Sequence, residues 1–423
     1  MPAAESGNGK PLPILVVGGG IAGLTCAIEA AEAGNRVVVV EKSPCLGGRV
    51  AGFHQYFPKL CPPPCGLEIN FRRIRNNSLI AVHTLAELKD LCGKPGDYEA
   101  IIRFNPRYVT AQCTMCGECS RVCPSETPDP FDYGMSSARA IRLPHRFAYP
   151  AQYAIDREAC MDGCHACADA CRYGAVDLAQ KPVLEKMRVA SVVVATGWAP
   201  YDAARIDNLG FRRFSNVITN VMLERLAAAD GPTGGRILRP SDGKVPRAVA
   251  FIQCAGSRDE NHLPYCSGVC CTASLKHAAY IRSQYPDAKI TMFYIDLRTP
   301  GELDHFAAKT VADTGIELIK GKVARVQEHP GSRDLLVTAE DVLRGRKITR
   351  EYDLLVLAVG MVPQTADLPM GIRTDQFGFV TEAASGIHGA GCARFPADTA
   401  ASVRDGTGMT LRAMQSVSAG RES

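Results

Sequence analysis

The chain has 423 residues, 46% of them hydrophobic and 22% charged, so it is long and apolar enough for two or three folded units and is not a disordered protein. Its 48 lysines and arginines against 44 acidic residues leave a net charge of only +4, which gives no electrostatic case for binding nucleic acid or an anionic membrane surface. No apolar run approaches the ~18–20 residues of a membrane span or resembles a secretory signal, so we expect a cytoplasmic chain with no direct membrane span.

The start of the chain predicts a tail followed by a parallel α/β unit. Residues 1–12 are rich in small residues and proline and are expected to form a flexible tail. A short β-branched run at 14–17 predicts a buried strand, an alanine-rich stretch at 24–33 predicts a helix, and 36–40 predicts a second buried strand. A strand, glycine-rich turn, helix and strand in this order are typical of nucleotide-binding folds.

The turn of this unit carries the pattern Gly18-x-Gly20-x-x-Gly23, and Glu41 ends the second strand. Gly18 permits the tight turn, Gly20 lets the backbone approach a pyrophosphate, and Gly23 lets the helix pack closely on the strand. The free N–H groups at the helix start attract phosphate, and Glu41 is suited to accept hydrogen bonds from ribose hydroxyls. The pattern predicts a dinucleotide site. The expected contacts are Gly18, Gly20, Ile21, Ala22, Gly23, Glu41 and Lys42.

The first cysteine group begins at residue 113, in a chain with eighteen cysteines. In a long chain without an export signal, cysteines serve metal binding or redox chemistry more often than structural disulfides. The run Cys113-x2-Cys116-x2-Cys119-x3-Cys123-Pro matches the bacterial ferredoxin pattern. Zinc sites normally separate their cysteine pairs by a longer loop, so the spacing favours a [4Fe–4S] cluster.

A second run of four cysteines follows at 160–171, with one extra residue in its first gap and Arg172 where proline is usual. We expect a second [4Fe–4S] cluster here, within a ferredoxin-like insert over 107–182. In two-cluster ferredoxins the fourth cysteine of each run ligates the other cluster. By that rule one cluster is held by Cys113, Cys116, Cys119 and Cys171, and the other by Cys160, Cys164, Cys167 and Cys123. The proline-rich segment 125–158 between the runs is expected to be a wrapped loop with short helical pieces.

The third cysteine group follows a strand predicted at 249–252, where a second dinucleotide domain would carry its glycine pattern. That pattern is absent, and Cys254-x11-Cys266-x3-Cys270-Cys271 stands in its place, followed by a predicted helix at 272–284 and strand at 290–295. A nicotinamide-type domain is thus outlined with its phosphate turn replaced by thiols, which argues against NAD(P)H as the direct electron donor. We expect a third, irregular cluster; the alternative is a pair of buried cysteines beside two incidental ones.

Several short signals favour FAD as the dinucleotide. The glycine pair and arginine at 47–49 resemble the continuation found in FAD proteins with two dinucleotide domains. The strand 192–194 runs into an Ala-Thr-Gly turn, as such folds do where they return to the FAD domain, and a similar strand at 354–359 ends at a glycine. At 387–392 (IHGAGC), Cys392 replaces the acidic residue that such families direct at the flavin ribityl or phosphate region. The expected contacts are Gly48, Arg49, Ala195, Thr196, Gly197, Gly391 and Cys392.

Three segments carry a family resemblance: 14–75, including YFPKLCPPPCGLEINF at 56–71, then 251–271, and IHGAGCARFP at 387–396. They resemble the A subunits of heterodisulfide reductases and, more closely, the flavin subunits of quinone-interacting membrane-bound oxidoreductases (Qmo). The resemblance covers nearly the whole chain after residue 12. It implies FAD in a thioredoxin-reductase-like scaffold, and Lys276 near flavin N5. The cluster ligands that it implies in the third group are Cys254, Cys266, Cys270 and Cys271.

The expected fold is therefore α/β, a Rossmann flavoprotein with two dinucleotide-binding domains and an inserted ferredoxin-like α+β module with two clusters. The expected divisions are a tail at 1–12, the FAD domain at 13–106, the insert at 107–182, more of the FAD domain with a linker at 183–244, a NAD-domain-like region with the third cysteine group at 245–348, and the last part of the FAD domain at 349–423.

The expected function is that of an FAD and iron–sulfur electron-transfer subunit. The partners that the resemblance implies are adenylylsulfate reductase, a QmoB-like flavin and iron–sulfur protein, and a QmoC-like membrane haem and quinone protein. The chain would then be associated with the membrane only through a partner. Two alternatives remain open: a flavin-dependent thiol–disulfide reductase that uses Cys61 and Cys65, and a non-catalytic scaffold that wires electrons without flavin chemistry.

Overall fold

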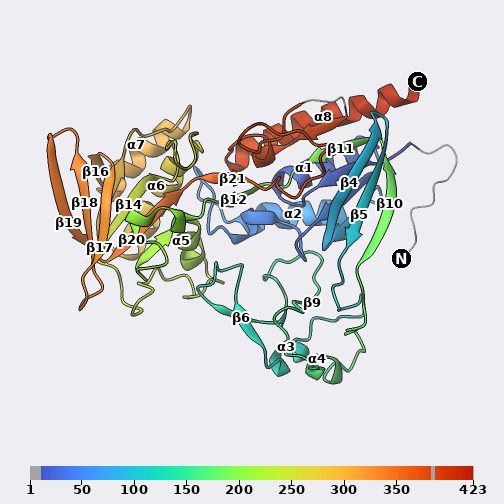
Figure 1. The fold of residues 1–423 in the computed structure, drawn as a ribbon, viewed down its shortest axis with the longest axis horizontal. Coiled ribbons are helices and arrows are strands. Elements are labelled where there is room, and N and C mark those ends of the chain that lie inside the picture. The colour runs from blue at the N-terminus through green and yellow to red at the C-terminus, as the bar shows by residue number, and fades with distance from the viewer. Residues whose placement is uncertain (1–10, 383–385, 423) are drawn as a thin grey trace.

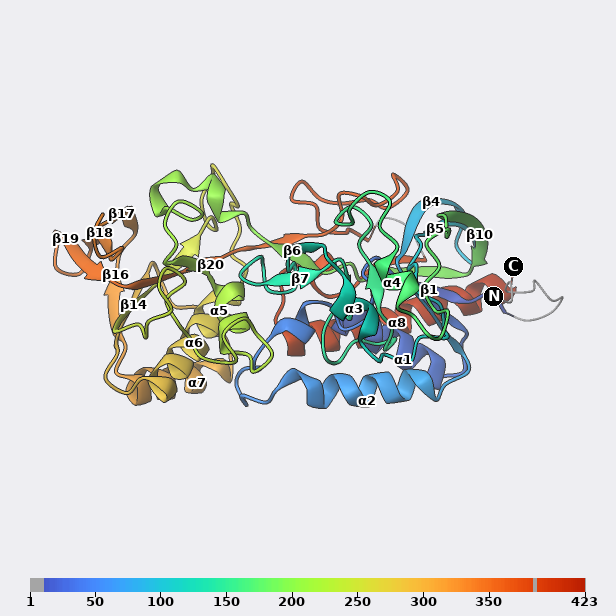
Figure 2. The ribbon, with the colours of Figure 1, turned by 90° about the horizontal axis from the view of Figure 1, so that it is seen from below.

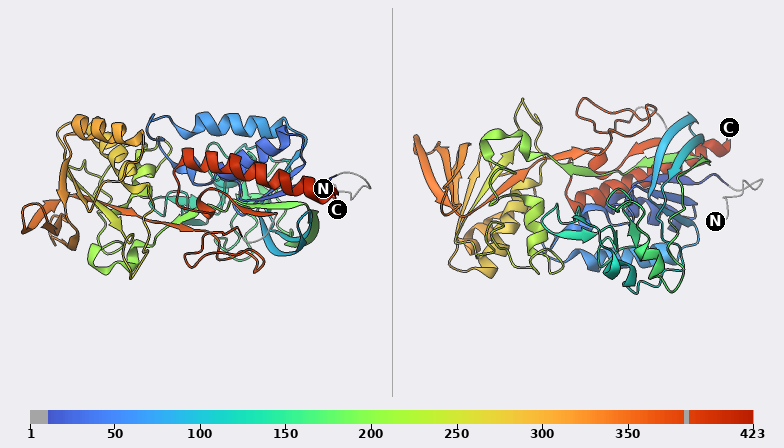
Figure 3. Two further views of the ribbon diagram at one scale, coloured as in Figure 1. Left: turned by 90° about the horizontal axis from the view of Figure 1, so that it is seen from above. Right: turned by 60° about the horizontal axis from the view of Figure 1, so that its bottom comes forward.

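The computed structural model of the chain describes residues 11–382 and 386–422, so most of the predicted tail at 1–12 lies outside the described residues. Two α/β domains lie side by side in Figure 1. A third body lies below the first domain in this view and is formed by the segment between two strands of that domain. In both views of Figure 3 the two α/β domains lie side by side, and the third body overlaps the first domain.

The first domain is built on a parallel sheet with the strand order β22-β11-β1-β2-β3. Its strands are β1 (Ile14–Val17), β2 (Val37–Glu41), β3 (Ile80–Thr84), β11 (Ser191–Val194) and β22 (Ile387–Gly389). The β1 and β2 strands are buried on both faces, which explains why they read as unbroken β-branched runs rather than as alternating patterns.

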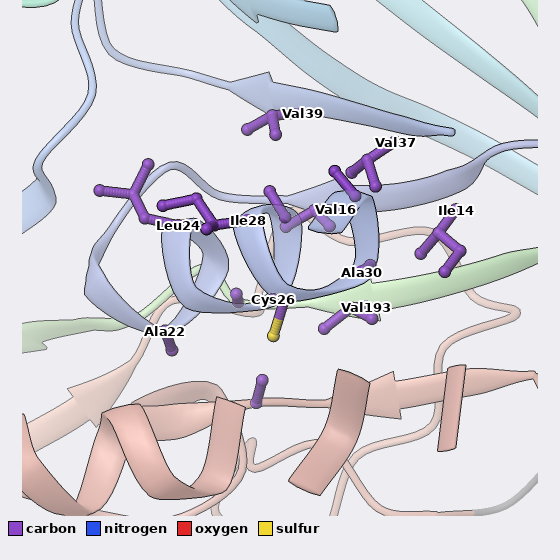
Figure 4. Close-up of a cluster of buried hydrophobic side chains, with 14 of the residues drawn as sticks. Ile14, Val16, Ala22, Leu24, Cys26, Ile28, Ala30, Val37, Val39 and Val193 are labelled. Atoms are coloured by element: carbon purple, nitrogen blue, oxygen red, sulfur yellow. The ribbon is translucent and has the colours of Figure 1, made fainter. Parts of the chain in front are cut away.

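Side-chain alternation divides the core of this domain into two layers. Ile14 and Val16 face the helices, while Leu15 and Val17 face an antiparallel sheet on the other side. The helices are α1 (Ile21–Glu32), α2 (Pro63–Arg75) and α8 (Thr399–Glu422); the antiparallel sheet is β4 (Ala86–Lys94), β5 (Asp97–Phe104) and β10 (Val183–Val189), in the order β10-β5-β4. Cys26 of α1 points toward α8 (Figure 4), where its thiol donates to the Gly406 carbonyl at 3.2 Å.

The second domain repeats these three layers. Its parallel sheet has the order β13-β20-β14-β15-β16, with helices on one face and an antiparallel sheet on the other. The parallel strands are β13 (Val217–Thr219), β14 (Ala248–Ala255), β15 (Lys289–Tyr294), β16 (Glu317–Lys320) and β20 (Leu354–Val359). The other elements are α5 (Asn220–Ala227), α6 (Cys270–Gln284), α7 (Leu303–Thr314), β17 (Val323–Glu328), β18 (Leu335–Asp341) and β19 (Arg346–Tyr352).

Two antiparallel strands, β12 (Trp198–Pro200) and β21 (Met361–Pro363), connect the domains. Residues 105–182, which we call the insert segment, leave the first domain after β5 and return at β10 (Figure 1). The elements of the insert segment are α3 (Glu118–Val122), β6 (Glu126–Pro128), β7 (Ser137–Arg139), β8 (Ile141–Arg142), β9 (Ala154–Ile155) and α4 (Ala166–Asp169). Short 3-10 turns lie at η1 (Gly48–Gly52), η2 (Ala203–Arg205), η3 (Asp207–Leu209) and η4 (Gly391–Ala393).

Three expectations about this architecture are wrong. The strand at 354–359 does not belong to the FAD domain, because β20 pairs in parallel with β13 and β14 in the second sheet. For the same reason the divisions at 183–244 and 349–423 cut across domains: β13, α5 and β20 belong to the second domain. Between residues 125 and 158 the structure has the antiparallel pairs β6-β7 and β8-β9 in place of the expected helical pieces. Strand pairing depends on distant partners, which a local apolar run does not specify.

Candidate functional site

A cavity of about 360 Å³ lies where the two domains and the insert segment meet. It opens at the carboxyl ends of the parallel strands of the first domain, which is where open α/β sheets bind ligands. Most of the predicted cofactor contacts line it: Gly20, Ile21, Ala22, Glu41, Gly48, Arg49, Ala195, Thr196, Gly197 and Cys392, together with Lys276. Gly18, Gly23, Lys42 and Gly391 are not among the lining residues.

The glycines of the fingerprint are required by close approach and backbone conformation. Gly18 has φ +112°, and a Cβ there would lie 2.3 Å from the Ala195 carbonyl oxygen. A Cβ on Gly23 would lie 1.9 Å from the Gly18 carbonyl oxygen, so α1 packs directly on the turn. Gly20 precedes α1 with no side chain capping the helix, which leaves the first N–H groups of α1 open to a ligand.

The acidic residue that follows the fingerprint is held in place by the backbone. The Glu41 carboxylate accepts hydrogen bonds from the Gly19 N–H at 2.6 Å and from the Ser43 N–H at 2.7 Å. Glu41 lines the cavity, and each carboxylate oxygen keeps acceptor capacity for a ribose hydroxyl. The exposed ammonium of Lys42, a further predicted contact, pairs with Asp367 at 3.1 Å, and neither residue lines the cavity.

The side of the cavity formed by β11, α5 and β22 contains polar atoms without partners. Within the described residues, Thr196 Oγ1 and Asn220 Oδ1 are buried and form no hydrogen bond, and both residues line the cavity. Buried polar atoms are normally satisfied, so these two fit a bound polar ligand. The Cys392 thiol donates to the Ala397 carbonyl at 3.3 Å, and burial raises its pKa. The Gly391 N–H donates to Asp405 of α8 at 2.8 Å, so an acid contacts this turn from elsewhere in the chain.

A buried charge cluster closes the side of the cavity formed by α5 and α6. Lys276 is 3% exposed; its ammonium pairs with Glu224 and donates to the Gln55 carbonyl at 2.7 Å. Glu224 also contacts His277 Nε2 at 2.5 Å and accepts from the His54 N–H at 2.9 Å. Burial by itself raises the pKa of Glu224, but Lys276 and His277 outweigh it and hold the pKa at about 2. Burial lowers the pKa of His277, so Lys276 is the cation that balances Glu224.

The cysteines of the insert segment are brought together across the two runs. Cys113, Cys116, Cys119 and Cys171 line one small cavity, the combination that the crossed ferredoxin rule predicts. Cys123 lies within electrostatic reach of Cys160 and Cys167 and packs with them in one apolar cluster. Burial raises the pKa of Cys119 to about 11, so its thiol needs a bound metal to become a thiolate near neutral pH.

The third group gathers at the end of β14 and the start of α6. Cys254 lies within electrostatic reach of Cys271 and Cys266, and Cys270 within reach of all three. Cys254 has φ +56° and lies at an irregularity in the pairing of β14 with β20. Cys270 also lines the large cavity, so this group adjoins the predicted flavin site.

Four thiols in each set are the donors that a [4Fe–4S] cluster uses. Across residues 11–382 and 386–422, no three His, Cys, Asp or Glu side chains lie close enough together to hold a metal ion as they stand. In a [4Fe–4S] cluster the irons and sulfides lie between the four cysteine thiolates, so the cysteine sulfurs are farther apart than the ligand atoms of a single metal ion. The donor chemistry and the grouping of the thiols therefore fit clusters.

Cys61 and Cys65, the pair considered for disulfide chemistry, lie at the start of α2. Both are exposed, and neither lines the cavity. The Cys61 thiol lies 3.8 Å from the Lys59 carbonyl oxygen. A thiol pair that exchanges electrons with a flavin must contact it, so this position does not favour the reductase alternative.

Several residues of the site were not predicted from the sequence. Glu224 and Asn220 lie on α5, in a stretch read as linker, and Tyr133 comes from the proline-rich part of the insert segment. Trp198, which follows the predicted Ala-Thr-Gly turn, also lines the cavity. Only Trp198 could have been inferred from the sequence, because it directly follows a predicted contact. The positions of the other residues depend on packing between parts of the chain that are distant in sequence.

Comparison with known proteins agrees with this site. Residues 13–63 match the family described as FAD dependent oxidoreductase. The chain is 37% identical over 416 residues to the A subunit of the H(2):CoB-CoM heterodisulfide,ferredoxin reductase of Methanothermobacter marburgensis, covering 94% of this chain and 63% of that protein. It is 38% identical over 425 residues to the second iron-sulfur A subunit of the CoB–CoM heterodisulfide reductase of Methanopyrus kandleri, covering 96% and 64%. The chain thus spans a little under two thirds of the length of these relatives.

Solved structures show the same fold at low identity. The thioredoxin reductase of T. acidophilum superposes with a TM-score of 0.53 at 12% identity, covering 98% of this chain and 99% of that one. The bacillithiol disulfide reductase Bdr (YpdA) from Bacillus cereus gives 0.52 at 14% identity, covering 98% and 100%. No helix in the described part of the chain is long and apolar enough to cross a membrane. The chain is therefore similar over nearly its whole length to the A subunits of heterodisulfide reductases, and it has the Rossmann flavoprotein fold of the thioredoxin reductases.

Proposed function

We propose that the chain is an FAD and iron–sulfur electron-transfer subunit of a heterodisulfide reductase-like complex. The observation that carries the proposal is the position of Cys270, which belongs to the third thiol group and also lines the cavity of the glycine fingerprint. A cluster held there would adjoin the flavin. FAD supplies exchange of electrons in pairs or singly, whereas [4Fe–4S] clusters pass them one at a time, so the combination converts between the two regimes.

The chain's own residues would hold and tune the cofactor. The N–H groups of Ile21 and Ala22 are available for the pyrophosphate, and Glu41 for the adenosine ribose. Lys276 brings a buried positive charge to the cavity, suited to the N5 region of the flavin, and Glu224 fixes the position of that charge. The proposed cluster ligands are Cys113, Cys116, Cys119 and Cys171 for one cluster, Cys160, Cys164, Cys167 and Cys123 for the second, and Cys254, Cys266, Cys270 and Cys271 for the third.

A finer proposal concerns the complex. The resemblance of the segments at 56–71 and 387–396 to Qmo flavin subunits supports the role of a QmoA-type subunit in sulfur metabolism. It would exchange electrons between adenylylsulfate reductase and a membrane haem and quinone subunit, beside a QmoB-like flavin and iron–sulfur subunit. The chain would then be cytoplasmic and held at the membrane by its partners. Anaerobic co-purification from membranes tests this: recovery of a quinone-reactive haem protein supports it, and recovery of heterodisulfide-reducing subunits alone contradicts it.

The central proposal is tested by anaerobic purification with iron, sulfide and flavin analysis and EPR during a redox titration. We expect one FAD and about twelve irons per chain, since each of three cubes holds about four. Zinc in place of iron and sulfide, or a colourless protein that binds no added FAD, would contradict the proposal. A protein that keeps its irons without flavin would instead support the wiring scaffold.

A further inference from the structure

The tip of the β6-β7 hairpin, residues 129–136, reaches from the insert segment into the flavin cavity. Pro130, Phe131 and Tyr133 line that cavity, although the rest of the insert segment lies away from it. Figure 2 shows β6 and β7 directed from the α3 and α4 region toward α5 of the second domain. The cysteine-bearing part of the chain therefore contributes a wall to the site of the glycine fingerprint.

A buried ion pair fixes the hairpin tip against the second domain. Arg225 of α5 is 1% exposed; its Nε donates to Asp132 Oδ1 at 2.8 Å, and its guanidinium lies 4.3 Å from the centre of the Phe131 ring. Asp132 is 5% exposed and also accepts from Ser136 Oγ at 2.6 Å. A buried charge destabilises the fold unless its partner stays in place, so the Arg225–Asp132 pair holds the hairpin tip in one position.

Tyr133, at the end of this tip, has a strained backbone. Its φ of +54° lies in the left-handed region, which is unfavourable for a non-glycine residue and persists only where neighbouring contacts impose it. Such outliers gather at functional sites. Here the strain directs an aromatic side chain at the cofactor cavity rather than at solvent.

The phenol of Tyr133 is oriented for contact with a ligand. Its oxygen accepts a hydrogen bond from Arg49 Nη1 at 3.1 Å, and Arg49 is itself held by the Trp198 carbonyl and lies 5.1 Å from the centre of the Trp198 ring. Burial raises the pKa of Tyr133, so the phenol stays protonated. With Arg49 serving as donor to the oxygen, the O–H of Tyr133 remains available to donate into the cavity.

We propose that Tyr133 contacts the bound flavin through its ring and hydroxyl, so that retention of FAD depends on the hairpin tip of the insert segment. This inference rests on the proposed function, since it takes the cavity to be the flavin site. The same stretch of chain runs from Cys123 to Tyr133, so the tip also joins one cysteine run to the cofactor cavity. The proposal is supported by Tyr133 itself, which has a left-handed backbone, is held by Arg49, and lines the cavity at the glycine fingerprint although it comes from the insert segment.

The test compares Tyr133→Gly and Tyr133→Phe with the wild-type protein under anaerobic conditions. Glycine relieves the left-handed strain while it removes the side chain, so the backbone gives no reason for instability. We expect Y133G to bind FAD about tenfold or more weakly, through loss of the aromatic contact and the hydroxyl, with iron and sulfide content unchanged. Y133F should weaken FAD binding by about two- to tenfold, the value of one hydrogen bond. The FAD dissociation constant and the flavin midpoint potential are the measurements.

Arg333→Gly is the matched control. Arg333 is exposed in the loop before β18, has φ +58° and lies outside the cavity, so R333G relieves the same kind of strain without touching the flavin site. Its FAD affinity should equal that of the wild type. Wild-type affinity and potential in an iron-replete Y133G would overturn the inference; if Y133G loses its iron, unchanged values in Y133F would overturn it. A wild-type protein that binds no FAD would instead reject the proposed function itself.

Discussion

Among the described glycines of the first domain, Gly23 is the one at which an added Cβ would approach another atom most closely. The 1.9 Å separation between a Cβ at this position and the Gly18 carbonyl oxygen leaves no room for even one methyl group, and Val16 Cγ1 lies at 3.2 Å on another side. The obstructing atom is backbone in the turn that would carry the pyrophosphate. A substitution here must therefore move α1 or the turn, and both define the cofactor site.

Gly23→Ala should destabilise the protein by about 1–3 kcal/mol, the usual cost of overpacking, and should abolish tight FAD binding. Thermal unfolding and flavin content measure the two effects. Gly66→Ala in α2 is the control, because its Cβ would meet no atom within 4 Å and its φ is not positive. There alanine should stabilise by about 0.5–1 kcal/mol through helix propensity. A G23A protein as stable and as yellow as the wild type would contradict this account of the turn.

At the scale of elements, the insert segment owes its arrangement to pairing between its two cysteine runs. The short helices α3 and α4, which carry Cys119 and Cys167, pack close to each other, and Cys171 shares a cavity with the first run. Short elements of this kind bury little apolar surface of their own. Cluster binding should therefore contribute much of the order of the segment.

The crossed ligand sets predict how irons are lost from double variants. Cys113→Ala with Cys171→Ala removes two ligands of one proposed cluster and should cost about four irons per chain. Cys160→Ala with Cys171→Ala removes one ligand from each of two clusters and should cost about eight. Iron and sulfide analysis with EPR of the reduced proteins distinguishes them. The reverse order of iron loss would show that each run ligates its own cluster.

At the scale of the whole molecule, one buried network joins the two domains beside the cavity. Glu224 of α5 and Lys276 of α6 belong to the second domain, whereas the His54 N–H and the Gln55 carbonyl that they contact belong to the first. The charged groups of this network are shielded from solvent, since Glu224 and Lys276 are only 4% and 3% exposed. The relative position of the domains and the charge at the cavity are thus set by the same groups.

This network should make stability depend on pH in the acid range. The pKa of Glu224 is about 2 in the folded state, below its ordinary value of 4.5, so its stabilising effect is complete above pH 4.5 and is lost as the pH falls toward 2. Glu224→Gln should cost about 3–5 kcal/mol near neutral pH, because it leaves Lys276 buried without its counter-ion, and should flatten the acid dependence. Urea unfolding between pH 2 and 7 measures both effects.

Glu317→Gln is the control for this experiment. Glu317 pairs with Arg350 on the surface, with 44% of its side chain exposed, and such pairs contribute about 0–1 kcal/mol. The stability of E317Q should follow the wild-type pH profile closely. An E224Q protein with the wild-type slope between pH 4.5 and 2 would show that other carboxylates carry the acid dependence.

The sequence by itself determined the local features of this protein. The strand, turn and helix at 14–33 were predictable because Gly23 contacts Gly18, only five residues earlier, and Gly18 has the positive φ that the tight turn requires. The two-domain flavoprotein fold expected from the sequence is confirmed by the structural comparisons. The cysteine spacings predict the two crossed ligand sets, since the ferredoxin pattern contains both the spacing and the crossing, and Cys113, Cys116, Cys119 and Cys171 line one cavity.

Only the tertiary structure decided that β13 and β20 belong to the second domain. It also decided that the Lys42 ammonium pairs with Asp367, and that Glu224 and Tyr133 line the cavity. A buried β-branched run predicts a strand but not its neighbours, because pairing is settled by packing between segments far apart in the chain. Likewise, an acid on a short helix or a tyrosine in a proline-rich loop has no local pattern that marks it as buried. Their roles arise where the two domains and the insert segment meet, and that meeting depends on long-range contacts.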